Sequence, residues 1–102
     1  MSDWTFLSNH AYVLVCVASD PQMRLREIAD RVGITERAAH RIVVELEASG
    51  YLTRSRVGAR NAYQVHVDRP LRHPLERDRA IGDVLRAIMA EPAAAPAPSS
   101  AA

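Results

Sequence analysis

The sequence predicts an α+β fold that is mostly helical, and three observations carry this prediction. Two amphipathic segments meet at a sharp turn beside Gly33, two alternating segments enclose a polar turn after them, and an apolar segment flanks this unit on each side. The expected elements, in chain order, are helix 8–19, a very short strand at 22–24, helix 26–32, helix 36–49, strands 52–57 and 62–67, and helix 75–90. A chain of 102 residues predicts one domain, expected over residues 1–91.

The first apolar segment centres on the run from Ala11 to Ala18, which fits a buried strand as well as a helix because valine and tyrosine favour strands. A helix is preferred, with Ser8 as its N-cap and Asp20-Pro21 as its stop. A helix that is apolar all round is buried on more than one side. Its second side can be buried in two ways: by another subunit, or by the last helix of the same chain.

The two central helices carry the signals of a tightly joined pair. Gly33 suits the left-handed residue that closes the first helix, and Thr35 can cap the second by accepting a hydrogen bond from a free N–H group. Helical spacing turns the apolar side chains of the second helix inward. Its outer face then consists of Glu36, Arg37, His40, Arg41, Val44 and Glu45. A short helix with two arginines and a histidine toward its exposed start fits a DNA major groove.

The expected hairpin has its turn at residues 58–61 and a cationic tip that holds Arg56, Arg60 and Asn61, with Arg54 nearer the body. Such a tip beside a groove-binding helix can contact phosphates or the minor groove. Taken alone, the hairpin is better explained as a solvated structure whose arginines only prevent edge-to-edge aggregation. Its position directly after the helix pair favours nucleic acid.

Charge is distributed unevenly along the chain. The net charge is only +1, but residues 24–60 hold eight arginines against five acidic residues. Every basic residue is arginine, which forms forked contacts with phosphate and guanine. A GC-rich genome, which favours arginine codons, is a better explanation of that composition than selection for DNA contact. The inference of nucleic-acid binding therefore rests on where the charges lie and not on the choice of arginine.

The rest of the sequence argues against catalysis and metal binding. No glycine-rich phosphate loop is present, the four histidines lie on different elements, and no Ser, His and Asp or Cys and His arrangement converges in any obvious fold. Cys16 stands alone and fits a small buried hydrophobe. No enzyme activity, cofactor or metal is therefore expected. The apolar run is too short to span a bilayer, which favours a cytoplasmic location, and residues 92–102 have the composition of a disordered tail.

Residues 25–65 resemble the winged helix-turn-helix of MarR-like bacterial transcription regulators. The resemblance lies in the run from Ala29 through Gly33 to Ile42, in Gly50-Tyr51-Leu52, and in the VGARNAYQV hairpin. It implies a nucleoid-associated homodimer that binds a two-fold site in double-stranded DNA, with the outer face of helix 36–49 on the bases. The DNA-binding side chains are then Thr35, Glu36, Arg37, His40, Arg41, Arg54, Arg56, Arg60 and Asn61.

The chain is shorter than full-length MarR-like regulators and lacks the long helices that build their dimer and ligand pocket. Dimerisation is therefore expected through helices 8–19 and 75–90, and no small-molecule effector is expected. A second function stays open: a winged-helix module that binds another protein without reading DNA, favoured by the near-zero net charge and by Glu36. RNA is a third partner, although few aromatic side chains are available to stack on bases.

Overall fold

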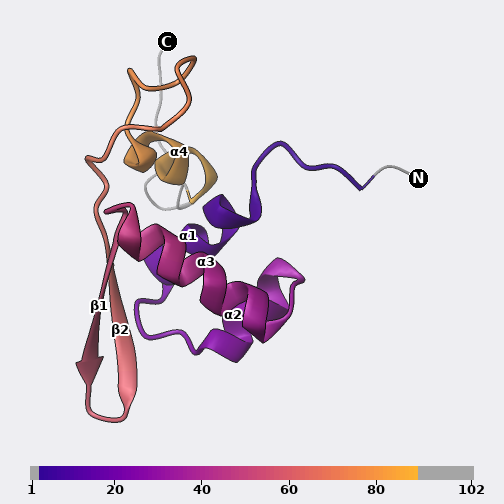
Figure 1. Cartoon of the computed structure of the whole chain (residues 1–102), viewed down its shortest axis with the longest axis vertical. Helices are drawn as coiled ribbons and strands as arrows, with labels where there is room; N and C mark the ends of the chain where they lie inside the picture. The colour runs from indigo at the N-terminus through magenta and orange to yellow at the C-terminus, as the bar shows by residue number, and fades with distance from the viewer. Residues whose placement is uncertain (1–2, 90–102) are drawn as a thin grey trace.

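The computed structural model describes residues 3–89, which form four helices and one two-stranded sheet (Figure 1). The elements are α1 (Asn9–Ser19), α2 (Leu25–Val32), α3 (Glu36–Ala48), β1 (Leu52–Val57), β2 (Arg60–Val65) and α4 (Ile81–Ile88). This architecture confirms the predicted α+β, mostly helical fold. The predicted end of the domain at residue 91 and the predicted tail 92–102 lie outside the described residues.

Helix α1 lies at the centre of the core, in contact with α2, α3, β2 and α4. Val13 and Val17 are fully buried, and Leu14 and Cys16 nearly so. These side chains are therefore buried within the same chain, by α2, α3 and β2 as well as by α4, the last helix. The predicted cap is also confirmed, because the Ser8 hydroxyl accepts a hydrogen bond from the N–H of Ala11 at 3.4 Å.

The turn between α2 and α3 forms as predicted. Gly33 adopts φ of +87°, and its N–H donates to the carbonyl of Ala29 at 2.8 Å, which ends α2 in a left-handed residue. Thr35 then caps α3 by accepting from the N–H of Ala38 at 3.0 Å. Ala29 is buried, as expected for a small residue where two helices cross closely.

The short strand expected at 22–24 is wrong. The N–H of Met23 donates to the carbonyl of Asp20 at 3.0 Å, and the Asp20 carboxylate accepts from the N–H of Gln22 at 3.1 Å. These bonds hold the segment in a turn. One backbone hydrogen bond still links this segment to the sheet, from Tyr63 N–H to the carbonyl of Pro21 at 2.8 Å.

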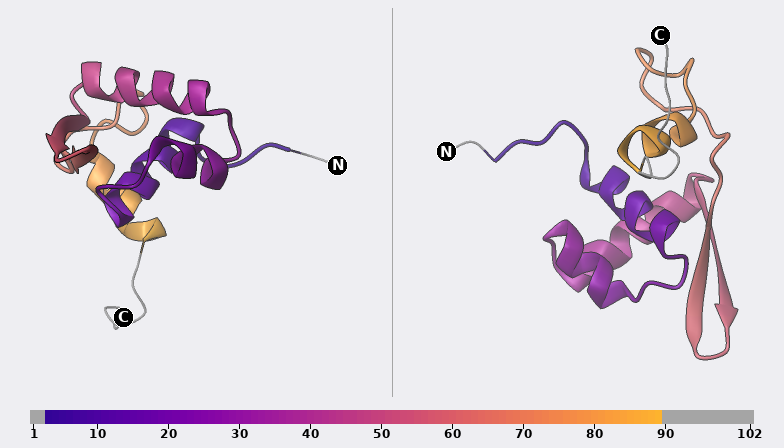
Figure 2. Two further views of the ribbon diagram at one scale, coloured as in Figure 1. Left: turned by 90° about the horizontal axis from the view of Figure 1, so that it is seen from below. Right: turned by 180° about the vertical axis from the view of Figure 1, so that it is seen from behind.

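Strands β1 and β2 pair in antiparallel register from Leu52 opposite Val65 to Val57 opposite Arg60. The turn contains only Gly58 and Ala59, so it is two residues shorter than the predicted 58–61, and β2 spans Arg60–Val65 instead of 62–67. Gly58 has φ of +63°, the conformation that a two-residue hairpin turn requires of glycine. The hairpin tip projects beyond the helices, while its base packs on the core (Figures 1 and 2).

The predicted helix 75–90 is wrong over its first part, because α4 begins only at Ile81. The preceding segment loops back on itself: Leu71 N–H donates to the carbonyl of Arg79 at 2.9 Å, and Ile81 N–H donates to the carbonyl of Arg69 at 2.8 Å. This pairing keeps the backbone before α4 extended. Leu75, the first residue of the predicted helix, is 91% exposed. Residue 90 lies outside the described part of the chain.

Helix α4 is fixed by close backbone contact and by a carboxylate cap. Gly82 N–H donates to the carbonyl of Val67 at 2.9 Å, and a Cβ on Gly82 would lie 2.9 Å from that oxygen. The Asp83 carboxylate accepts from the N–H of Ala80 at 3.0 Å, which lowers the pKa of Asp83 from its ordinary value. Ile81 and Leu85 then complete the core against α1.

Candidate nucleic-acid interface

The outer face of α3 is exposed, as its helical spacing predicts. Six side chains face solvent: Glu36, Arg37, His40, Arg41, Val44 and Glu45. The intervening positions are buried: Ala39, Ile42, Val43 and Leu46. The two arginines and the histidine therefore lie on a free surface and do not pack into the protein.

Some charged side chains on this face of α3 are paired with other residues of the chain, and others are not. Arg41 Nη1 lies 3.3 Å from Glu45 Oε2, and Glu45 Oε1 lies 2.7 Å from His10 Nε2 on α1. The hydrogen bond with His10, followed by the nearby Arg41, holds the pKa of the Glu45 carboxyl below its ordinary value. Arg37 and His40 make no ion pair among the described residues, so they can meet a ligand without first losing a partner.

The hairpin arginines differ in the same way. Arg54 Nη2 lies 3.3 Å from Glu47 Oε1 with both side chains about one-third exposed, which ties the base of the hairpin to the end of α3. Arg56 Nη1 donates to Asn61 Oδ1 at 3.3 Å across the two strands. Arg60 is exposed beside the turn and forms no ion pair within residues 3–89.

A hollow of about 280 Å³ between the start of α2 and the hairpin tip adds a residue that sequence reasoning missed. Arg24 lines it together with Arg56, Arg60 and Asn61. Arg24 stands at the N-cap position of α2, and the turn at residues 20–23 brings that position close to the hairpin. Arg24 is the first residue of the arginine-rich stretch, which could have indicated its role. Because the predicted short strand included Arg24, its position beside the hairpin was missed.

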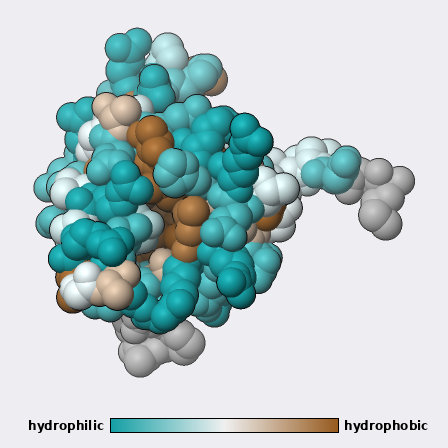
Figure 3. All heavy atoms as spheres, turned by 60° about the horizontal axis from the view of Figure 1, so that its bottom comes forward, coloured by the Kyte–Doolittle hydropathy of each residue, from teal (hydrophilic) through white to brown (hydrophobic). Residues whose placement is uncertain are grey.

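The side of the molecule that carries α2, α3 and the hairpin tip has a mostly hydrophilic surface. Figure 3 shows this surface with a narrow hydrophobic strip between hydrophilic regions. In Figure 2 (left), α3 runs along one edge of the molecule and the hairpin lies beside it. A polar partner that is longer than α3 could therefore contact the helix and the hairpin together.

The described part of the chain contains no comparable group of side chains for metal binding or thiol chemistry. Residues 3–89 contain no group of three or more metal-ligating side chains, and none of their helices is long and apolar enough to cross a bilayer. Cys16 is buried, and burial raises the pKa of its thiol, which confirms its expected role as a small hydrophobe.

Comparison with known proteins finds one family model and one solved structure that are similar to this chain. Residues 9–56, which include α1, α2 and α3 and most of β1, match the family model described as the IclR helix-turn-helix domain. Among solved structures, the PcaV transcriptional regulator from Streptomyces coelicolor, crystallised with its natural ligand, aligns with a TM-score of 0.51 and 20% sequence identity. The alignment covers 82% of this chain and 61% of PcaV, so the chain spans about three-fifths of that regulator. No curated protein sequence matches the chain.

The comparisons confirm the fold and leave the narrower family open. The matching model belongs to the IclR type, whereas the sequence resemblance pointed to MarR-like regulators. Both descriptions share a helix-turn-helix, which is the part of the chain with the strongest local signals. The chain therefore has a winged-helix fold that carries a helix-turn-helix similar to the IclR helix-turn-helix domain.

Proposed function

We propose that this chain is a sequence-specific transcriptional regulator that binds double-stranded DNA, with α3 in the major groove and the hairpin on phosphates or in the minor groove. One observation carries the proposal: the exposed face of α3 bears Arg37, His40 and Arg41 beside a hairpin whose tip bears Arg56 and Arg60. A helix in the major groove and a cationic hairpin on the backbone divide recognition into base contacts and positioning contacts.

The residues of α3 take different roles in this proposal. Arg37 has no ion-pair partner among the described residues and lies in the first turns of the helix, where such helices contact base edges. Arg41 first exchanges Glu45 for a phosphate or base. Thr35 holds the helix start, and Glu36 accepts from a cytosine amino group where one faces it.

The hairpin residues serve mainly as phosphate contacts. Arg56, Arg60 and Asn61 lie at the tip, and Arg24 adds a fourth polar side chain around the same hollow. Arg54, although predicted as a DNA contact, is paired with Glu47 and is better placed to hold the hairpin against α3. The phosphate contacts should give a binding constant that depends on salt.

We also propose that the regulator binds as a homodimer whose interface includes α1 and α4. Two half-sites separated by roughly 34–36 Å are the usual way in which such modules lengthen their recognition sequence. The chain itself buries most apolar side chains of α1, so the interface must draw on the exposed apolar residues near both helices. These are Trp4, Phe6, Leu75 and Ile88.

Selection of bound fragments from random DNA tests the proposal. A regulator should enrich one sequence, with two half-sites if it binds as a dimer. Replacing Arg37 with Ala should weaken binding to the selected sequence by about 1–3 kcal/mol and relax the preference at one base pair. Arg77→Ala, in the exposed loop before α4, is the matched control and should leave binding unchanged. Failure to enrich any sequence would reject sequence-specific binding.

The exposed aromatic pair Trp4 and Phe6 favours a second candidate, a winged-helix module that binds another protein. Pull-down from a lysate with and without nuclease separates the two functions. Partners that depend on nucleic acid support the regulator, whereas partners that survive nuclease and require Trp4 support the protein-binding module.

A further inference from the structure

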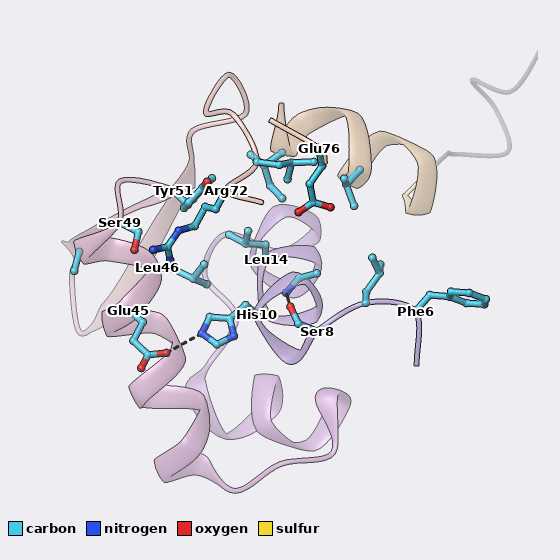
Figure 4. A pocket seen from close by; sticks show the side chains of 16 residues that line it. Phe6, Ser8, His10, Leu14, Glu45, Leu46, Ser49, Tyr51, Arg72 and Glu76 are labelled. Carbon is cyan, nitrogen blue, oxygen red and sulfur yellow. Dashed lines mark hydrogen bonds and ion pairs between the residues drawn. The ribbon is translucent and has the colours of Figure 1, made fainter. Parts of the chain in front are cut away.

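A cleft with a volume of about 770 Å³ lies at the opposite end of α3 from the helix-turn-helix turn. It opens between α1, the second half of α3, the loop before α4, and α4 itself (Figure 4). Leu14, Leu46 and Ile81 form buried apolar parts of its wall. This volume falls in the range of about 300–1,000 Å³ that ligand-binding clefts occupy.

The rim of the cleft is polar. His10 and Glu45 form their hydrogen bond on one side, and Arg72 and Glu76 lie on the other (Figure 4). An apolar floor inside a polar rim suits an aromatic group that also carries a hydrogen-bond donor, because the ring is removed from water while the donor finds a carboxylate. The guanidinium of Arg72 can also lie over such a ring.

An aromatic segment with this chemistry begins at the mouth of the cleft. Residues 3–8, named here the aromatic arm, run from α1 away from the body of the molecule (Figure 1). Trp4 is 67% and Phe6 91% exposed, and their ring centroids lie 4.9 Å apart with the planes at 84°. The two aromatic side chains together form an exposed apolar patch, and such patches mark interaction sites.

The aromatic arm does not fill the cleft of its own chain. Phe6 stands at the mouth of the cleft, but its ring points away from it (Figure 4). The Thr5 hydroxyl donates to the carbonyl of Leu7 at 2.6 Å, which fixes the direction in which the arm leaves. From Ser8 to Trp4 the arm reaches at most about 14 Å, so its target must lie directly against α1.

We infer that the aromatic arm of each chain binds the cleft of a second copy, so that two chains exchange arms across a two-fold axis. A two-fold interface pairs the same surface on both subunits, and here each copy offers both an aromatic arm and an apolar cleft that share one edge. Trp4 enters between the cleft walls with its indole N–H toward a rim carboxylate, and Phe6 covers the mouth. This inference rests on the homodimer proposed above and specifies which residues form it.

Trp4 is the only tryptophan of the chain, so its fluorescence reports the arm directly. The experiment records emission wavelength and acrylamide quenching over a range of protein concentrations, with mass measured in parallel by sedimentation. The inference expects a dimer at high concentration with blue-shifted, protected Trp4, and loss of both features together on dilution. A dimer whose Trp4 stays as accessible as free tryptophan overturns it, as does a monomer whose Trp4 is protected at every concentration.

Three variants make this test specific. Phe6→Ala removes arm surface, and Ala48→Glu places a charge on an exposed position of the cleft lining. Each should raise the dimer dissociation constant at least tenfold while the circular dichroism spectrum stays unchanged. Val57→Ala removes an exposed apolar side chain from the hairpin, far from the cleft, and should leave dimerisation unaffected. Equal dimerisation by all three variants and the wild type contradicts arm exchange.

Binding to one half-site separates this inference from the proposed function. If arm exchange is correct, Phe6→Ala and Ala48→Glu should bind a single half-site as the wild-type monomer does and lose only affinity for the paired site. A wild-type protein that prefers no DNA sequence but protects Trp4 on dimerisation rejects the proposed regulator and supports arm exchange. A wild-type protein that prefers one DNA sequence but leaves Trp4 unprotected on dimerisation supports the regulator and rejects arm exchange.

Discussion

The carboxylate of Glu45 links α1 to the exposed face of α3. Its oxygens contact His10 on α1 and Arg41 on the exposed face of α3, at the rim of the cleft. The carboxylate therefore connects the core helix to the proposed DNA-binding face. Because the hydrogen bond with His10 lowers its pKa, protonation of Glu45 should weaken both contacts.

This pairing predicts a pH dependence of stability. The folded-state pKa of Glu45 lies below its ordinary value of 4.5, so its contribution is complete above that value and is lost as pH falls through the lowered pKa. Glu45→Gln should be less stable than the wild type at pH 6, and the difference should shrink toward pH 3. Urea unfolding at several pH values measures it. Parallel pH profiles for the two proteins would contradict this role for Glu45.

Two hairpin arginines should separate stability from DNA binding. Arg54→Ala removes the contact with Glu47 and should lower the free energy of unfolding by about 0.2–1 kcal/mol. Arg60→Ala should leave stability unchanged and reduce the slope of log binding constant against log salt by about 0.9. Urea unfolding and salt-titrated DNA binding of both variants test the pair. Equal salt slopes for Arg60→Ala and the wild type would exclude a phosphate contact at this residue.

At this scale, sequence spacing predicts which side chains of α3 face outward, because a helix repeats its direction every 3.6 residues. It does not predict their partners. Arg54 meets Glu47 only because β1 starts beside the end of α3, and Arg24 reaches the hairpin only because residues 20–23 turn. Such contacts depend on how elements pack, which no local pattern specifies.

Among the elements, two glycines close helices in the left-handed conformation and form a matched pair. Gly33 has φ of +87° with open space around its Cα, and Gly50 has φ of +85° with the Arg69 guanidinium packed against it. A Cβ on Gly50 would lie 3.0 Å from Arg69 Nη2, which donates to the carbonyl of Ser49. Substitution at Gly50 therefore adds a steric contact to the strain that both positions share.

Gly33→Ala should cost about 1–2 kcal/mol through backbone strain alone. Gly50→Ala should cost more, because Arg69 must also move and release its bond to Ser49. Thermal unfolding of both variants gives the comparison, with the wild type as reference. A smaller cost at Gly50 than at Gly33 would show that Arg69 gives way freely and does not hold this turn.

Element boundaries follow local signals where those signals are strong. Ser8, Gly33 and Thr35 begin or end helices as predicted, since each satisfies backbone groups that the helix leaves open. The predicted start of the last helix fails because backbone pairing between segments 69–71 and 79–81 extends the chain there. This pairing joins residues about ten positions apart, so periodicity in one segment cannot indicate it.

For the whole molecule, α1 decides how much surface remains for assembly. Its contacts with α2, α3, β2 and α4 bury the side chains that the sequence left open for a partner. The aromatic arm, the cleft and the exposed side of α4 offer apolar surface away from the α2–α3 turn and the hairpin tip, whereas Val44 and Val57 are exposed singly on α3 and the hairpin. DNA binding and self-association can therefore occupy different faces of one small domain.

Chemical-shift mapping by NMR, with unlabelled duplex of the selected sequence added to labelled protein, tests the central claim most directly. The account predicts that amide shifts concentrate on the start and exposed face of α3, on the hairpin tip, and at Arg24. Shifts confined to the aromatic arm, the cleft and α4, with the α3 face unchanged, would contradict it.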